Sequence, residues 1–68
     1  MSYIQTGEIH EDRLVPDDKA VVVKADHSNV TYQWLNEDGT RNTEPWAVQT
    51  TTKDWFERAF QLTQGVLA

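Results

Sequence analysis

The sequence has no cysteine, and this absence removes several kinds of stabilisation and chemistry at once. Disulfides, thiolate metal sites and cysteine nucleophiles are all excluded. A chain without cysteine is consistent with a reducing compartment. The three glycines, Gly7, Gly39 and Gly65, lie far apart in the chain, so no glycine-rich phosphate-binding loop is present.

Basic residues and long apolar runs are also scarce. Six Lys and Arg face eleven Asp and Glu, which gives a net charge of -5. This balance opposes direct binding to nucleic acid, because that affinity depends on Lys and Arg contacts with phosphates. No run approaches the roughly 20 apolar residues of a membrane span. Residues 1–4 lack the basic and apolar regions of a signal peptide, so we expect an unprocessed, cytoplasmic protein.

Three stretches contain residue types used in catalysis or metal binding, and none has the required arrangement. Residues 26–28, Asp-His-Ser, are neighbours in a predicted turn and cannot converge as a catalytic triad does. Residues 10–12, His-Glu-Asp, lack a further ligand at metal spacing and are interpreted as surface charge. Residues 36–39 superficially resemble part of a calcium loop, but Trp34 and Pro45 fall where side-chain oxygens are needed. We therefore expect no catalytic residue, metal or cofactor.

The length of 68 residues predicts a single domain spanning residues 1–68. A domain of this size buries only about 60% of its unfolded surface, so it needs efficient packing or a partner. All three tryptophans and both phenylalanines lie between residues 29 and 65, which predicts that the core forms there.

Residues 1–19 are predicted to form an acidic N-terminal segment. Within it, residues 3–9 are compatible with a short, weak edge strand that Gly7 interrupts. Residues 8–13 are charged and are expected to be solvated. The sequence Pro-Asp-Asp-Lys at 16–19 predicts a turn, because proline presets φ and the aspartates can bond their own backbone.

Residues 20–50 are predicted to form a β-meander, in which antiparallel strands follow one another through short polar turns. The valine-rich residues 20–25 predict a strand that is covered on both faces and therefore central in the sheet. Residues 30–35 predict the next strand, whose alternate residues Val30, Tyr32 and Trp34 share the core face.

The return strand of this meander is reached through a turn at residues 36–39. Gly39 is expected to adopt a positive φ there, at little steric cost. Pro45 cannot donate a hydrogen bond to a sheet, so the strand is expected to resume over residues 46–50.

Residues 51–64 predict an amphipathic helix at the end of the domain. Thr51 is the expected N-cap, with Asp54 in an approximate capping box. Gly65 is the expected left-handed C-cap. The face predicted to meet the core consists of Trp55, Phe56, Ala59, Phe60, Leu62 and Thr63.

Together these elements predict an α+β fold: a small antiparallel β-meander of three to four strands with one C-terminal amphipathic helix packed on one face. The other face of the sheet would carry Leu35, Ala47 and alternate valines of residues 21–23. That face would meet either water or a partner, because exposed apolar area of this kind marks protein interfaces.

The acidic residues gather in the N-terminal segment and at the hairpin end. One interpretation is that they keep a small domain soluble. The other is that they dock on a basic partner protein. Tryptophan is enriched in binding hot spots, which adds an aromatic component to such a surface. The residues predicted to bind a partner are Glu8, Glu11, Asp12, Asp17, Asp18, Glu37, Asp38 and Trp46.

These observations lead us to expect a non-enzymatic interaction module, an adaptor or an inhibitor, that binds another protein through acidic and aromatic surface. One alternative is a structural or accessory subunit that associates with copies of itself, in the simplest case as a homodimer. A further alternative is an inhibitor that mimics nucleic acid and occupies the site of a DNA- or RNA-binding protein. The last is an enzyme or small-ligand binder whose site forms across an oligomer interface.

Overall fold

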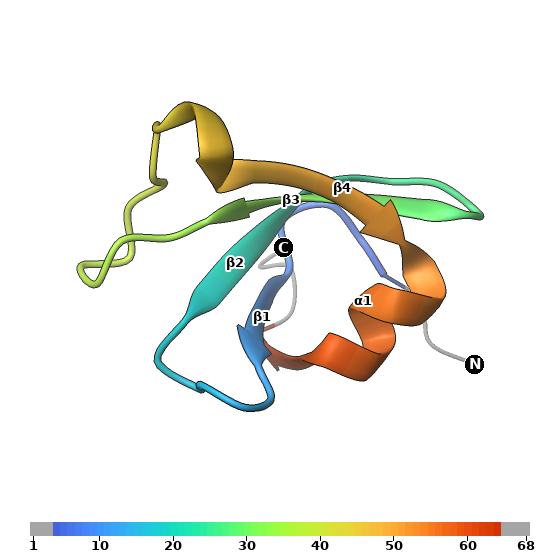
Figure 1. The fold of residues 1–68 in the computed structure, drawn as a ribbon, viewed down its shortest axis with the longest axis horizontal. Coiled ribbons are helices and arrows are strands. Elements are labelled where there is room, and N and C mark those ends of the chain that lie inside the picture. Colours follow the sequence, from blue (N-terminus) through green and yellow to red (C-terminus); the bar gives the residue numbers. More distant parts are fainter. Residues whose placement is uncertain (1–3, 65–68) are drawn as a thin grey trace.

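The computed structural model describes residues 4–64 and shows a curled antiparallel sheet of five strands with one short α-helix (Figure 1). The strands run in the order β4-β3-β2-β1-β5 across the sheet. Their bounds are β1 (Ile9–Asp12), β2 (Lys19–Ala25), β3 (Asn29–Trp34), β4 (Val48–Thr52) and β5 (Phe60–Gln64). A 3-10 helix, η1 (Pro45–Ala47), precedes β4, and α1 (Lys53–Ala59) connects β4 to β5. The predicted α+β class is confirmed, whereas the strand number is five rather than three or four.

The valine run forms the central strand β2, as predicted. It pairs with β1 on one side and with β3 on the other, where Val21 stands opposite Ile9 and Gln33 respectively. Ala20, Val21 and Val22 are all buried, so side chains on both faces of this strand are removed from water. A continuous apolar, β-branched run suits such a position because neither face meets solvent.

Residues 8–13 are predicted to be solvated, and this prediction is wrong for Glu8 and His10, whereas Arg13 is exposed. Most of them form β1, which lies inside the sheet between β2 and β5 rather than at an edge. Glu8 and His10 are both buried, while Ile9 and Glu11 beside them are half-buried. Alternation along a strand places every second side chain on the inner face, and here that side chain is ionisable. Gly7 lies in a turn with a φ of 94°, so the strand begins only at Ile9.

The predicted helix over 51–64 is also corrected, since α1 has 7 residues and the chain continues as β5. The N-cap is Thr52 rather than Thr51, and its Oγ1 accepts a hydrogen bond from the backbone N–H of Trp55 at 3.2 Å. Phe60 has extended backbone angles and pairs with Asp12 of β1. Pairing with β1 therefore overrides the helical spacing of the sequence. The predicted C-cap Gly65 lies outside the described residues.

The return strand starts two positions later than predicted. Trp46 lies in η1, whose first residue is Pro45. The first N–H groups of a helix have no partner within the helix, so a proline there costs no hydrogen bond. The strand itself is β4, from Val48 to Thr52. The turn before it is confirmed: Gly39 has a φ of 89° and its N–H donates to the carbonyl of Asn36 at 2.9 Å.

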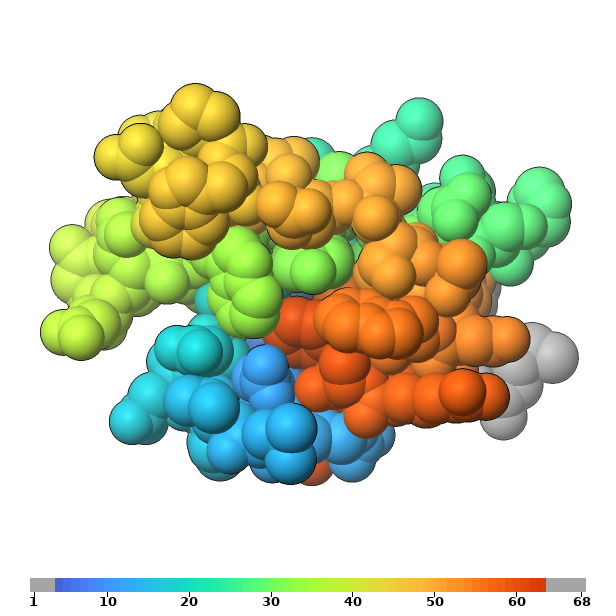
Figure 2. Space-filling view, in the orientation of Figure 1, coloured from blue at the N-terminus to red at the C-terminus, as the bar shows by residue number. Residues whose placement is uncertain are grey.

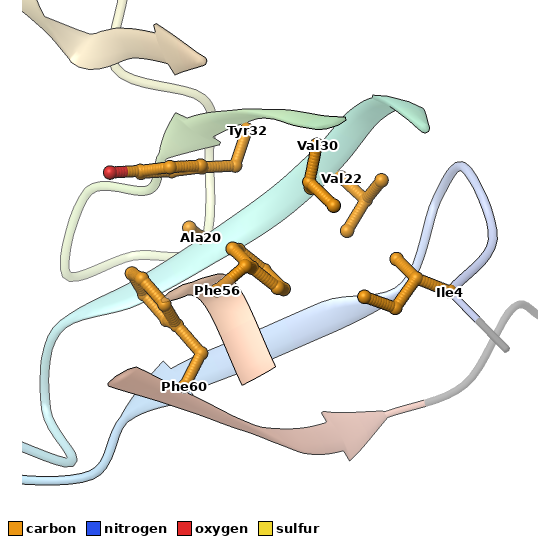
Figure 3. Packing of buried hydrophobic residues seen from close by; sticks show 7 residues of the cluster. All are labelled: Ile4, Ala20, Val22, Val30, Tyr32, Phe56 and Phe60. Carbon is orange, nitrogen blue, oxygen red and sulfur yellow. The ribbon is translucent and has the colours of Figure 1, made fainter. Parts of the chain in front are cut away.

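The core lies between the concave face of the sheet and α1, and aromatic rings dominate it (Figure 3). Phe56 of α1 stacks on Phe60 of β5 with ring centroids 4.7 Å apart and planes 17° apart. Both rings approach Tyr32 of β3, at 5.5 and 5.2 Å. These three rings therefore join the helix to two strands that are far apart in the sheet order. The buried cluster consists of Ile4, Ala20, Val22, Val30, Tyr32, Phe56 and Phe60.

The broad apolar face predicted on the other side of the sheet is not present. Val21 and Ala47 are buried there and Leu35 is half-buried. Trp55 and Leu62, which were predicted to meet the core, are instead 50% and 55% exposed. The exposed large apolar side chains lie in loops, on α1 and on the edge strands: Leu14, Val15, Trp46, Val48, Trp55 and Leu62.

Two adjacent aromatic residues of α1 test this core. Phe56→Ala is expected to lower the free energy of unfolding by about 3–5 kcal/mol, because its ring is fully buried. Trp55→Ala is the matched control on the same helix; its side chain is half exposed, so the expected loss is roughly 1 kcal/mol. Urea unfolding followed by circular dichroism measures both losses. Equal losses in the two variants would contradict the assigned core.

Candidate functional site

Two acidic loops project from the same end of the sheet. β1 and β3 each run antiparallel to β2, so they point in the same direction and their following loops emerge together. The first loop spans residues 13–18 and the second spans residues 35–44, and both lie at the left of Figure 1. The acids carried by these loops and by the end of β1 are Asp12, Asp17, Asp18, Glu37, Asp38 and Glu44.

A groove of about 270 Å³ opens between these loops. Figure 2 shows the hollow between the segment around residues 36–46, in green to yellow, and the segment around 12–20, in blue to cyan. We call it the Trp groove, and its lining residues are Asp18, Trp34, Leu35, Asn42 and Trp46.

One wall of the Trp groove is fixed to the core through Trp34. Its ring meets the ring of Tyr32 edge-on, at 5.6 Å and 90°, and that of Phe60 at 5.5 Å. The backbone carbonyl of Trp34 accepts a hydrogen bond from the N–H of Asn42 at 2.9 Å. The side-chain amide of Gln33 donates to the carbonyl of Asn42 at 2.9 Å. These contacts hold the second loop against the end of β3.

The other wall is the exposed indole of Trp46. Its neighbour Ala47 in η1 is fully buried, whereas Trp46 itself is 58% exposed. The carbonyl of Trp46 accepts a hydrogen bond from the side-chain amide of Gln49 at 2.6 Å, which ties η1 to β4. A large aromatic ring thus faces solvent on a short, well-anchored segment.

The carboxylates around the Trp groove are not neutralised by Lys or Arg. Within the described residues, the pair of salt-bridge length is Glu8 with His10, and none joins a loop carboxylate to a basic side chain. Asp12 accepts hydrogen bonds from the N–H groups of Leu14 and Val15, at 2.8 and 3.3 Å. Hydrogen bonds from the Thr40 side chain, and then from its N–H, lower the pKa of Asp38. The loops therefore present negative charge at neutral pH.

The structure brings together six of the eight residues predicted to bind a partner. Asp12, Asp17, Asp18, Glu37, Asp38 and Trp46 all lie at this end of the sheet. Glu8 does not, because its side chain is buried at the other end of β1. Glu11 is engaged between strands, where its carboxylate accepts a hydrogen bond from the side-chain amide of Gln61 at 2.8 Å.

Sequence reasoning missed three residues that line the Trp groove: Trp34, Leu35 and Asn42. Trp34 was assigned to the core, and its ring does contact core residues while another part of it faces the groove. The direction of the predicted strands could have revealed which loops lie together. In a meander, loops that follow the first and third strands must meet at one end of the sheet.

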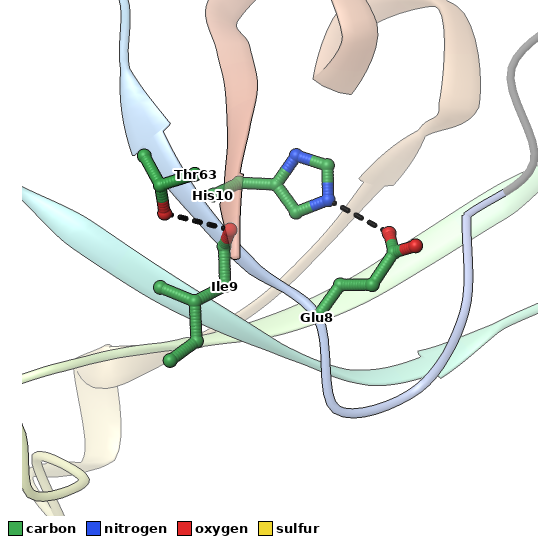
Figure 4. Close-up of polar contacts among 4 residues, drawn as sticks. All are labelled: Glu8, Ile9, His10 and Thr63. Atoms are coloured by element: carbon green, nitrogen blue, oxygen red, sulfur yellow. Dashed lines mark hydrogen bonds and ion pairs between the residues drawn. The ribbon is translucent and has the colours of Figure 1, made fainter. Parts of the chain in front are cut away.

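A second polar feature is the buried pair formed by Glu8 and His10 (Figure 4). The Nε2 of His10 lies 3.0 Å from Oε1 of Glu8, and the two side chains are 9% and 10% exposed. The imidazole also meets the edge of Phe56 with ring centroids 4.9 Å apart. Interpreting residues 10–12 as surface charge is therefore wrong for His10. Next to this pair, Thr63 donates its hydroxyl proton to the carbonyl of Ile9 at 2.9 Å.

Residues 26–28 form a turn, as predicted, and Asp26 organises it. Its Oδ1 accepts hydrogen bonds from the N–H groups of Ser28 and Asn29 at 2.8 and 2.7 Å. These bonds, that of Ser28 first, lower the pKa of Asp26. Within residues 4–64 no three His, Asp or Glu side chains gather as metal ligands would. In the same described part of the chain, α1 is too short and too polar to cross a membrane.

Comparison with protein-family models, with curated proteins and with solved structures finds no match to this chain. The function must therefore be argued from the geometry of the molecule itself.

The pKa of the Tyr32 hydroxyl tests whether Asp12, at the end of β1, lies near the ring that Trp34 contacts. Burial raises the pKa of Tyr32 above its ordinary value of 10.0, and the charge of Asp12 raises it further. Asp12→Asn is expected to lower the pKa of Tyr32 while leaving it above 10.0, because burial is the larger cause. Absorbance of the phenolate in a Tyr3→Phe background measures this pKa. An unchanged pKa would show that Asp12 does not lie near the ring.

The same shift predicts a loss of stability at high pH. The folded state holds the Tyr32 proton more tightly than the unfolded state does, since its pKa is raised on folding. This stabilisation is complete below about pH 10 and disappears as the pH rises through the folded-state pKa. The Tyr32→Phe variant, which lacks the proton, is the control and should lose less stability over that range.

Proposed function

We propose that this protein is a non-enzymatic interaction module, an adaptor or an inhibitor, that binds an extended, arginine-containing segment of a partner protein in the Trp groove. One observation carries the proposal. The exposed ring of Trp46 and the anchored ring of Trp34 line a groove whose wall includes Asp18, and the carboxylates of the two flanking loops form no salt bridge with Lys or Arg among the described residues.

The chemistry of the lining favours a guanidinium group. Tryptophan faces attract cations more strongly than other aromatic rings do. The carboxylate of Asp18 can accept two parallel hydrogen bonds from a planar guanidinium. Arginine also loses less hydration than lysine when it enters such a groove. Leu35 adds an apolar contact for the stem of the side chain.

The acidic loops support the same partner at longer range. The two loops and the end of β1 carry six carboxylates, and the whole chain carries a net charge of -5. A field of this sign raises the rate at which a basic segment arrives and disfavours acidic competitors. The groove contributes specificity because its rings and Asp18 contact one side chain directly. A mimic of nucleic acid would use the charges without the rings.

Peptide binding tests the proposal. The probe is a short peptide with arginines spaced among uncharged residues, and its affinity for the protein is measured by isothermal titration calorimetry. We expect Trp46→Ala and Asp18→Asn each to weaken binding by about tenfold or more, because each removes a direct contact with the guanidinium. Replacing arginine by citrulline in the peptide keeps the shape, removes the charge and should abolish the binding.

The matched control is Asp54→Asn, which removes one negative charge at the opposite end of the sheet, where α1 begins. It should change the affinity less than twofold. Three outcomes would each overturn the proposal: an undetectable interaction, equal affinity for the citrulline peptide, or full affinity in both groove variants.

Self-association remains a second candidate, and the edge strands favour it. β4 and β5 contain no charged residue, and they expose Val48 and Leu62. Charged residues on edge strands normally prevent sheets from pairing across molecules. The mass of the protein in solution over a concentration series tests this candidate. A dimer that Val48→Lys dissociates would support pairing through β4, whereas a monomer at every concentration would exclude it.

A further inference from the structure

The strand β4 has a free edge that is open to a further strand. Within residues 4–64, β4 is the last strand of the sheet and pairs with β3 alone. Val48, Gln49, Thr50 and Thr52 of this strand are exposed. β4 contains neither proline nor a charged residue, the two features that normally stop an edge strand from pairing with another chain.

One hydrogen bond beyond the end of β4 fixes the pattern of its ladder. Thr52 stands opposite Asn29, and the N–H of Lys53 donates to the carbonyl of Ser28 at 2.9 Å. In an antiparallel ladder, a bond between the residues that flank a pair identifies that pair as non-hydrogen-bonded. Thr52 and Asn29 therefore form a pair of this kind.

The two kinds of pair alternate along the strand, so the direction of the remaining backbone groups follows. Thr51 and Gln49 exchange hydrogen bonds with β3, whereas the N–H and C=O of Thr50 point away from β3 toward the free edge. The hydroxyls of Thr50 and Thr31 lie 2.9 Å apart, which holds the side chain of Thr50 on β3. The backbone of Thr50 thus offers one donor and one acceptor to a neighbouring strand.

This free edge is continuous with the Trp groove. Trp46 precedes Thr50 by four positions, and η1 leads directly into β4 (Figure 1). The side-chain amide of Gln49 donates to the carbonyl of Trp46, which holds the start of the strand against η1. An extended chain that pairs with β4 and continues past Val48 therefore reaches the indole of Trp46.

We propose that the partner segment adds to the sheet as a further strand beside β4, with its backbone paired to Thr50 and its arginine in the Trp groove. This inference rests on the proposed function, because it concerns the same arginine-containing segment. A second copy of the chain fits this edge less well. Neither β4 nor β5 contains a basic residue for the groove, and two copies with a net charge of -5 each repel one another.

Amide hydrogen exchange, measured by NMR on the free and the peptide-saturated protein, tests this pairing. The probe is the arginine peptide used for the Trp groove. In the free protein, the amide of Thr50 should exchange about tenfold faster than those of Gln49 and Thr51, which bond with β3. Saturation with the peptide should slow exchange at Thr50 by about tenfold or more, and it should slow Gln49 and Thr51 much less.

N-methylated peptides provide the matched controls. Each methyl group removes one backbone donor, and alternate donors of a strand face the same neighbour. Methylation at alternate positions should weaken binding roughly fivefold, and methylation at the positions between them should leave it nearly unchanged. On the protein, Thr50→Pro removes the outward N–H and should weaken binding by a similar factor, whereas Thr50→Ala retains it. The methylated peptides test the pairing even if Thr50→Pro fails to fold.

The outcomes separate the added strand from the arginine site. A shift of the Trp46 indole signal without protection of Thr50 would overturn the added strand and leave the arginine site standing. Equal affinity of all methylated peptides would do the same. Protection of Thr50 that grows with protein concentration in the absence of peptide would assign the edge to a second copy and overturn the inference. An unmodified peptide that does not bind would overturn both proposals.

Discussion

The fold depends on the ring of Phe60, the residue at which α1 ends and β5 begins. That ring stacks on Phe56, meets Trp55 from the same helix, and contacts Tyr32 and Trp34 of β3. It is therefore the point where the helix, the edge strand β5 and the inner strand β3 are held together. Because Trp34 is also a wall of the Trp groove, the core and the candidate site share a side chain.

Short-range sequence patterns predict correctly the elements that depend on the conformational preferences of their own residues. The valine run became the central strand because β-branched residues suit a strand buried on both faces. Gly39 marked the turn because it accepts a positive φ. The helix over 51–64 failed because Phe60 and Leu62 satisfy strand alternation as well as helical spacing. Pairing of Phe60 with Asp12, 48 positions away in the chain, decides between them, and no local pattern reveals it.

The sequence predicts most of the residue types of the candidate site, but not which of these residues lie together in the fold. Charge and residue type single out the acids and Trp46, and most of them lie in the loops at one end of the sheet. Their convergence follows from the direction of β1 and β3, which requires the strand assignment of β1. That strand was missed because ionisable residues occupy its inward positions. For the same reason Glu8 was placed on the surface and His10 was not recognised as its partner.

We propose that the Trp groove receives an arginine side chain, and the three tryptophan indole N–H signals test this binding most directly. In an NMR titration with the arginine peptide, the indole signals of Trp34 and Trp46 are expected to shift together and to saturate at one affinity. The signal of Trp55, which lies on α1 outside the groove, should remain in place. A shift of the Trp55 signal alone, or no shift of the Trp46 signal, would contradict binding of arginine in the Trp groove.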